Sequence, residues 1–163
     1  MRKYVALYIK MTISNFELAK MSETYGLHFT LENIIMNDEL KDIPLPKRGK
    51  TLYLILNSQK TGQSGMHWVA FIVRGKYAYF FDSYGAEPDS NVINYCQRHR
   101  LNLGSNNWII QSMKSTNCGL YCFALILFVT KWKPHGVALE FKKTEGLFEA
   151  CNDYVNLYVT DAK

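Results

Sequence analysis

An uncharged stretch in the second half of the chain constrains the fold more than any other feature of the sequence. No Asp, Glu, Lys or Arg occurs in residues 118–130, and residues 123–129 are all apolar. Asn117, directly before this stretch, is a favourable helix N-cap. A helix that has no charged face belongs in the protein interior. We therefore predict a buried central helix whose first turn carries Cys118.

The position of Cys118 at a helix N-terminus would alter the chemistry of its thiol. Unpaired backbone N–H groups and the helix dipole favour a thiolate there, and such cysteines have pKa values of roughly 3.5 to 7.5 instead of about 8.5. The same N–H groups can bind an oxyanion that forms on a carbonyl attacked by the sulfur. Taken alone, however, a cysteine at the edge of an apolar helix is more often a small buried hydrophobic residue.

Three other residues favour the chemical interpretation of Cys118 over the packing one. His67 opens one strand-like run, and Asp82 closes the next. Gln111 ends a strand that we expect over residues 108–111. A thiol, an imidazole, a carboxylate and a side-chain amide donor are the four parts of a thiol acyl-transfer site. Individually, the histidine would be an ordinary surface or core residue and the aspartate a turn former.

The segment that contains His67 and Asp82 has the pattern of a β-hairpin. Residues 67–73 and 76–82 are rich in β-branched and aromatic side chains and flank the dipeptide Arg74-Gly75. A two-residue loop at this dipeptide pairs His67 with Asp82 and brings the carboxylate beside the imidazole. A three-residue loop with a bulge would instead shift the pairing by one residue. Trp68, next to the histidine, is a candidate substrate-binding residue.

The other expected elements form a scaffold around the hairpin and the central helix. With 163 residues and 48% hydrophobic content, the chain is expected to be one domain spanning residues 1–163. Before the hairpin we expect an N-terminal helix that starts at a capping box in residues 14–17 and ends at Gly26, and a short helix from about Thr30 that covers Leu31, Ile34 and Ile35. A linker at 43–46, a buried strand at 52–56 and a polar loop at 57–65 follow. After the hairpin we expect a helix from Pro88 with Val92, Ile93 and Cys96 on its apolar side, a turn at 102–107 and a closing helix over 147–158.

The cysteines and the apolar runs indicate the compartment. The N-terminus has no apolar segment followed by a cleavage site, and the longest apolar run is far shorter than about 20 residues, so we expect neither secretion nor membrane insertion. Cys96, Cys118, Cys122 and Cys151 show no disulfide-framework spacing, which fits a reducing compartment. A zinc site of Cys118, Cys122 and His135 is a weak alternative because it lacks a fourth ligand.

The net charge of +5 comes from dispersed basic clusters. Such clusters can support a weak, salt-sensitive contact with nucleic acid. A solvated surface is the simpler interpretation, because no recognised nucleic-acid-binding motif accompanies the charge. A basic binding module without activity nevertheless remains a second class of function.

The order of these motifs resembles that of a known protease family. His-Trp-Val-Ala-Phe from His67, Phe-Asp-Ser-Tyr-Gly around Asp82, and Gln-x6-Cys-Gly-Leu-Tyr-Cys from Gln111 resemble the adenovirus-type endopeptidases and the ubiquitin-like-modifier proteases over about residues 50–130. The resemblance implies an α+β, papain-like cysteine protease variant, in which a central helix with the nucleophile packs on a mixed sheet flanked by further helices. It implies that Cys118 is the nucleophile, His67 the general base and then acid, Asp82 the group that orients the imidazole, and Gln111 an oxyanion donor together with the Cys118 N–H.

Finer features extend this resemblance to a viral group. Tyr121-Cys122 directly after Cys-Gly-Leu follows the adenoviral pattern, whereas Asp82-Ser83-Tyr84-Gly85 follows the cellular one. The mixture resembles the maturation proteases of virophages and polinton-like elements. That group implies a monomeric cysteine endopeptidase that cleaves capsid and other virion precursor proteins, located in the host cytoplasm or viral factory and in the virion.

The resemblance also bears on cofactors and on an alternative substrate. The chemistry requires no cofactor. Adenoviral members use DNA and a disulfide-linked peptide as activators, so the resemblance leaves a DNA or peptide activator open, although no cysteine here sits clearly at the linking position. A protease that removes a ubiquitin-like modifier would share every catalytic residue and is the alternative function.

Overall fold

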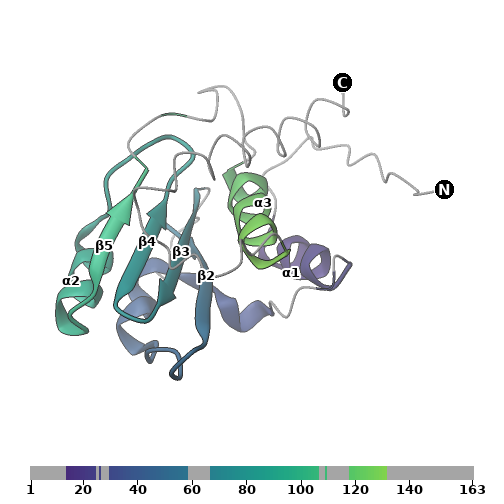
Figure 1. Ribbon diagram of the computed structural model, residues 1–163. Helices are drawn as coiled ribbons and strands as arrows, with labels where there is room; N and C mark the ends of the chain where they lie inside the picture. The colour runs from purple at the N-terminus through teal and green to yellow at the C-terminus, as the bar shows by residue number, and fades with distance from the viewer. Residues whose placement is uncertain are drawn as a thin grey trace.

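The computed structural model describes residues 14–24, 26, 30–58, 67–106, 109 and 118–131. These residues form a mixed α/β structure in which one five-stranded sheet lies between helices (Figure 1). In chain order the elements are α1 (Asn15–Thr24), η1 (Leu31–Asn33), β1 (Ile34–Met36), η2 (Asn37–Asp42), β2 (Thr51–Asn57), β3 (Trp68–Arg74), β4 (Tyr77–Phe81), α2 (Ser90–Arg98), β5 (Asn102–Ser105) and α3 (Cys118–Lys131).

The strands lie in the sheet in the order β1-β2-β3-β4-β5. The β2–β3 and β3–β4 pairs are antiparallel, whereas the edge strands β1 and β5 run parallel to their neighbours. Parallel neighbours need a crossover connection, and η2 and α2 lie in the two crossovers. The expected mixed sheet is confirmed, and the strand predicted at residues 52–56 lies within β2.

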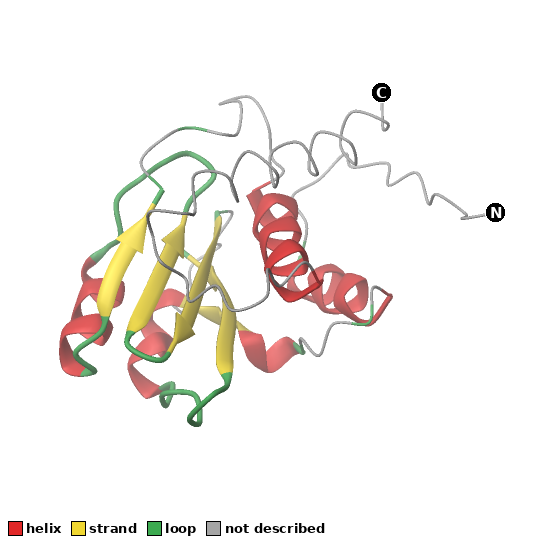
Figure 2. Cartoon of the chain, in the orientation of Figure 1, coloured by secondary structure: helices red, strands yellow, loops and turns green. Residues whose placement is uncertain are grey.

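Each face of the sheet packs against different helices (Figure 2). The even-numbered side chains of residues 68–72 belong to a core shared with α1 and α3, and the odd-numbered side chains of residues 69–73 belong to a core shared with α2 and η2. A strand that is covered on both faces explains the continuous apolar run in this segment. Burying one large apolar side chain contributes roughly 1.5–3 kcal/mol, so both cores stabilise the sheet that carries the site.

The helix α3 spans Cys118–Lys131, and the predicted N-cap Asn117 lies outside the described residues. Cys118 and Cys122 are 2% and 0% exposed, and Leu125 and Ile126 are also buried. The helix packs against β3 and β2 and contacts α1 (Figure 1). The sheet and α1 together cover the apolar surface of this uncharged helix.

The hairpin forms, but its loop lies one residue further along the chain than predicted. The observed pairs run from Ala70 with Phe81 to Arg74 with Tyr77, so the two loop residues are Gly75 and Lys76. Gly75 has a φ of +58°. A type II′ turn needs glycine at its first loop position, whereas a loop at Arg74-Gly75 would need a positive φ at arginine. The predicted direct pairing of His67 with Asp82 is therefore wrong, because the ladder ends before it reaches either residue.

Several scaffold predictions are confirmed. Ser14 and Glu17 form the capping box: the Ser14 N–H donates to the glutamate Oε2 at 2.7 Å, and the Glu17 N–H donates to the serine Oγ at 3.2 Å. Asp89 caps α2 by accepting hydrogen bonds from two backbone N–H groups, at 3.0 and 3.1 Å. On that helix, Tyr95 is fully buried and Ile93 is 39% exposed, which corrects the predicted apolar side.

Two predicted elements are corrected. The short helix from about Thr30 is only the single 3₁₀ turn η1, and Ile34 then enters the edge strand β1. β-branched residues favour a strand once a parallel partner is available. The expected turn at residues 102–107 contains β5, which pairs with β4 although its sequence, Asn-Leu-Gly-Ser, has little strand propensity.

Some predictions lie outside the described residues. These are most of the polar loop at 57–65, the strand at 108–111 apart from Ile109, and the closing helix at 147–158. Within the described ranges, no helix is both long and apolar enough to cross a membrane.

Candidate active site

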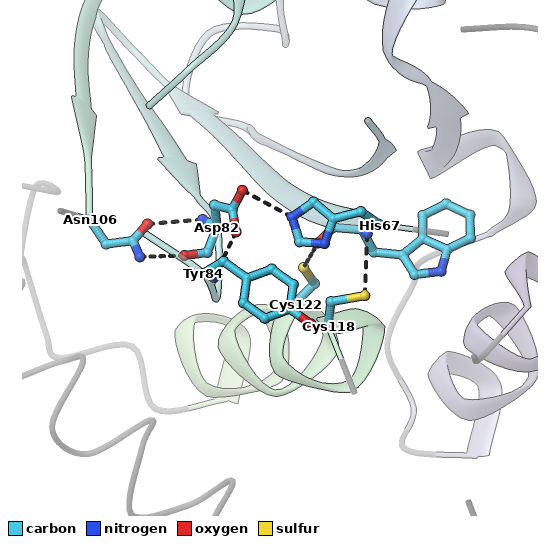
Figure 3. A network of polar contacts seen from close by, with 7 residues as sticks. His67, Asp82, Tyr84, Asn106, Cys118 and Cys122 are labelled. Carbon is cyan, nitrogen blue, oxygen red and sulfur yellow. Dashed lines mark hydrogen bonds and ion pairs between the residues drawn. The ribbon is translucent and has the colours of Figure 1, made fainter. Parts of the chain in front are cut away.

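Three separate segments bring polar side chains to one end of the sheet (Figure 3). His67 immediately precedes β3, Asp82 immediately follows β4, and Cys118 is the first residue of α3. Because β3 and β4 are antiparallel, the start of one strand and the end of the other lie at the same edge. The packing of α3 against β3 adds the thiol to this edge.

The imidazole of His67 and the carboxylate of Asp82 form a hydrogen-bonded ion pair. Nε2 lies 2.9 Å from Oδ2, and the two side chains are 24% and 5% exposed. The second carboxylate oxygen, Oδ1, accepts the backbone N–H of Tyr84 at 2.7 Å. Each carboxylate oxygen thus has its own hydrogen-bond donor, which fixes the plane of the carboxylate.

The main chain of Asp82 is fixed by a residue that sequence analysis does not single out. The buried Asn106 accepts the Asp82 N–H at Oδ1, 2.9 Å away, and donates from Nδ2 to the Asp82 carbonyl oxygen at 2.5 Å. Asn106 directly follows β5, which pairs with β4. Its side chain extends this pairing by bonding to the main chain of Asp82, directly after β4. The sequence carries no signal for this contact, because β5 itself was expected to be a turn.

The main chain of Trp68 connects the two thiols of α3 to the sheet. The Trp68 N–H donates to Sγ of Cys118 at 3.4 Å, and the Cys122 thiol donates to the Trp68 carbonyl oxygen at 3.4 Å. The first sulfur is an acceptor and the second is a donor. The two cysteines therefore occupy chemically different environments, although they are one helical turn apart.

The charges at the site favour an ion pair between His67 and Cys118. Burial lowers the pKa of His67, but hydrogen bonds and the negative charges of Asp82 and Cys118 outweigh it and raise the pKa from 6.5 to about 9. Burial raises the pKa of Cys118, but His67 and the N–H groups of Trp68 and Gly119 outweigh it and hold the pKa below its ordinary value. Both shifts favour a thiolate beside an imidazolium over a neutral thiol beside a neutral imidazole.

Cys122 has the opposite preference. Burial, together with the negative charges of Cys118 and Asp82, raises the pKa of Cys122 well above that of an ordinary thiol. A neutral thiol is a poor nucleophile. Cys118 is consequently the candidate nucleophile of the two.

The hydrogen bond of His67 to Asp82 also decides which ring nitrogen serves the thiol. With Nε2 engaged by the carboxylate, Nδ1 is the nitrogen that remains for Cys118 (Figure 3). Nδ1 is buried and makes no hydrogen bond of good geometry to any described residue. The thiol is nevertheless close enough to favour the protonated imidazole. Geometry of this kind often tightens only when a substrate binds.

Two predicted site residues remain predictions. Gln111 lies outside the described residues. Trp68 is 7% exposed and packs in the core shared with α3, so a contact of its side chain with substrate is untested. Among the described residues, no group of three or more His, Cys, Asp or Glu side chains could hold a metal ion, and His135 of the weak zinc alternative lies outside them.

The mixed α/β architecture is similar to that of a solved protease structure. Among solved structures, the chain is similar to the ASFV pS273R protease, with 18% sequence identity, a TM-score of 0.51, and coverage of 74% of this chain and 58% of that one. It also matches the SUMO protease Ulp1, in a structure whose catalytic cysteine is oxidised to a sulfinic acid, with 16% identity, a TM-score of 0.37, and coverage of 69% and 53%.

The likeness to the ASFV protease shows the fold alone. The chain spans a little over half the length of either protease. No protein-family model matches the sequence. No curated protein matches it significantly either.

Proposed function

We propose that this protein is a cysteine endopeptidase that uses Cys118 as nucleophile, His67 as general base and acid, and Asp82 as the orienting carboxylate. The observation that carries the proposal is the arrangement of a helix-N-terminal thiol, an imidazole and a buried carboxylate, with Nε2 of the imidazole 2.9 Å from Oδ2. The cysteine-protease fold shared with the ASFV enzyme supports it.

The first half of the reaction follows from these charges. Proton transfer from Cys118 to Nδ1 of His67 gives a thiolate and an imidazolium, and Asp82 stabilises the imidazolium through Nε2–H. The thiolate attacks a peptide carbonyl carbon, which forms a C–S bond and an oxyanion. The Cys118 N–H at the start of α3 and the predicted Gln111 amide donate hydrogen bonds to this oxyanion.

The second half returns the enzyme to its starting state. His67 transfers its proton to the leaving amine, and the C–N bond breaks to give a thioester. With His67 as base, water then attacks the thioester and the C–S bond breaks. The products are an amine, a carboxylate and free enzyme.

For the substrate, we propose capsid and other virion precursor proteins, cut during particle maturation in the host cytoplasm or viral factory and in the virion, with the enzyme acting as a monomer. The mixed viral and cellular motif around Asp82 and Cys118 and the likeness to a viral protease support this choice. The alternative, removal of a ubiquitin-like modifier, uses the same residues and is supported by the cellular pattern Asp-Ser-Tyr-Gly.

Incubation of the protein with virion precursor proteins and, separately, with modifier conjugates tests both proposals. We expect fragments of the precursor, whose N-termini sequencing will define, and intact conjugates. Cys118→Ala must abolish cleavage while Cys122→Ala, one turn along the same helix, must not. Cleavage of conjugates alone would favour the alternative, and cleavage by a folded Cys118→Ala protein would refute the mechanism. A folded wild-type protein that cleaves nothing and reacts with no thiol probe would favour the basic binding module.

We also propose that the end of the sheet remote from Cys118 contacts nucleic acid. Arg74 pairs with Thr51 and Tyr77, and Tyr77 pairs with Asn102. The connections before β2, between β3 and β4 and before β5 therefore lie at the same end of the sheet. The exposed basic residues on these connections or at the ends of the elements they join are Lys47, Arg48, Lys50, Arg74, Lys76, Arg98 and Arg100. Clustered cations bind phosphates with an affinity that falls as salt rises.

Binding of a DNA duplex at several salt concentrations tests this surface. Arg74→Glu combined with Lys76→Glu should weaken binding and flatten its salt dependence, whereas Lys20→Glu on α1 should have little effect. Equal effects of the two changes would refute the location. Cleavage rates with and without DNA will show whether the contact activates the enzyme.

A further inference from the structure

The main chain of Trp68 is bonded to both thiols of α3. Its N–H donates to Sγ of Cys118 at 3.4 Å, and its carbonyl oxygen accepts the Cys122 thiol at 3.4 Å (Figure 3). All three residues are buried, with exposed fractions of 7% for the tryptophan and of 2% and 0% for the two cysteines. One residue of β3 thus connects the candidate nucleophile to a second thiol.

The two contacts arise where the ladder between β3 and β4 ends. The last pair of this ladder joins Ala70 to Phe81, two residues after Trp68. Cys118 and Cys122 are four residues apart and therefore lie on the same face of α3, the helix that packs against β3. The thiols of α3 thus bond to main-chain groups that lie beyond the ladder.

The Cys122 thiol keeps its proton while the Cys118 thiol loses its own. Burial and the negative charges of Cys118 and Asp82 raise the pKa of Cys122 well above that of an ordinary thiol, whereas the pKa of Cys118 is lowered. Cys122 is therefore a hydrogen-bond donor at every pH at which Cys118 first becomes a thiolate. The carbonyl oxygen of Trp68 keeps this donor throughout.

The N–H of Trp68 acts directly on the charge of Cys118. A hydrogen bond that is donated to a thiolate favours the charged form, and this N–H is one of the groups that hold the pKa of Cys118 below its ordinary value. The Cys122 bond ties the same residue to the same helix from its carbonyl side. It therefore limits the movement of the Trp68 N–H away from the sulfur.

The other groups that act on the Cys118 sulfur do so from the sheet and from the helix itself. His67, paired with Asp82, and the N–H of Gly119 favour the thiolate. Tyr84 is close enough for the thiolate to raise the pKa of its hydroxyl. Replacing Cys122 with another neutral residue leaves all these groups in place, so a change in the titration of Cys118 would report on the main chain of Trp68.

We propose that Cys122 is a positioning residue for the nucleophile: its thiol holds the main chain of Trp68, whose N–H stabilises the Cys118 thiolate. No bond is made or broken at Cys122. This role rests on the proposed peptidase function and assigns a task to the second thiol of the helix.

The pH dependence of Cys118 alkylation by iodoacetamide in the intact chain tests this role without a substrate. Cys122→Ala should raise the midpoint of the Cys118 reaction by about half a pH unit, whereas Cys122→Ser keeps a donor and should keep the wild-type midpoint. Cys96→Ala, which removes a buried thiol from the core on the other face of the sheet, should leave the midpoint unchanged. On a peptide substrate, Cys122→Ala should move the acid side of the kcat/KM profile by the same half unit and leave its plateau close to that of the wild type.

An unchanged midpoint in Cys122→Ala would overturn the proposal. A midpoint in Cys122→Ser as high as that in the alanine variant would overturn it too, because lost packing would then explain both. If Cys122→Ala does not fold, Cys122→Val restores the volume without a donor and should also raise the midpoint. Because alkylation needs no turnover, a wild-type protein that cleaves nothing would refute the peptidase function and leave this result readable.

Discussion

The imidazole of His67 and the carboxylate of Asp82 are 2.9 Å apart at Nε2 and Oδ2, although the two residues are not partners in the strand ladder between them. The last paired residues at this end are Ala70 and Phe81. The contact therefore depends on what holds Asp82 beyond the sheet. Asn106 holds its main chain from β5, and the turn after β4 holds its carboxylate.

Replacing Asp82 with asparagine should preserve the fold and lower kcat by roughly 10²- to 10⁴-fold. An amide can still accept the Tyr84 N–H, but its NH₂ group would then face Nε2 of His67. Nε2 must become the acceptor, so the proton moves to Nδ1 and the imidazole can no longer take a proton from Cys118. Asp82→Glu should retain part of the activity because the group only orients the ring. Thermal unfolding and steady-state kinetics measure the two effects, and full activity in Asp82→Asn would contradict the assignment.

Asn106→Ala should reduce both stability and turnover. It leaves the buried Asp82 N–H without its acceptor, which costs about 1–3 kcal/mol of unfolding free energy, while the carbonyl keeps its bond from Gly85. The released main chain also loosens the carboxylate, so kcat should fall at temperatures where the variant is folded. Asn102→Ala, exposed on the same strand, should change stability by less than about 0.5 kcal/mol. Similar denaturation midpoints for the two variants would exclude the role of Asn106.

The pH dependence of cleavage should show a loss of activity at high pH. The folded pKa of His67 is raised from 6.5 to about 9, so the imidazolium that protonates the leaving amine persists below about 9 and disappears as the pH rises through it. On the acid side, activity should fall only where the Cys118 thiolate becomes protonated, below the range of an ordinary thiol. If kcat already falls as the pH rises through about 6.5, the pKa of His67 is not raised.

Gln111→Ala should lower kcat by about 10²- to 10³-fold, with little change in KM, because an oxyanion donor acts on charge that develops during attack. Gln111→Glu should be worse, since a carboxylate repels the oxyanion. If Gln111 only ends a strand, both variants would alter thermal stability more than turnover. Unchanged kcat in folded Gln111→Ala would falsify the oxyanion assignment and leave Cys118 and His67 unaffected.

The central helix and the faces of the hairpin could be predicted because both depend on local patterns. An uncharged run has to be buried, and the described side chains of α3 from Cys118 to Leu127 are buried. Moving the hairpin loop to Gly75 changes each partner by two residues, so Val73 faces Ala78. Side chains alternate with a period of two, and the faces therefore stay as predicted although the pairs do not. Extended beyond its last pair, the observed register would set Tyr84 opposite His67, and the tyrosine ring does lie against the imidazole.

The support around Asp82 could not be predicted because it comes from tertiary context. β5 pairs through its backbone with β4, and its polar sequence gives no strand signal. Asn106 lies 24 residues from Asp82 in sequence, so no local pattern connects the two. The hydrogen bond from the Tyr84 N–H to the Asp82 carboxylate could not be predicted either, because the sequence around it indicates only a turn.

The reactivity of Cys118 in the folded protein shows whether its thiol is the activated nucleophile. Iodoacetamide labelling of the protein between pH 5 and 10, with each modified cysteine identified by mass spectrometry, gives the pH dependence of every thiol without a substrate. We predict that Cys118 is alkylated below pH 8.5, before Cys122, and that peptide cleavage is lost in proportion. Alkylation of Cys118 only above about pH 8.5, as for an ordinary thiol, or preferential labelling of Cys122 in folded protein would contradict it.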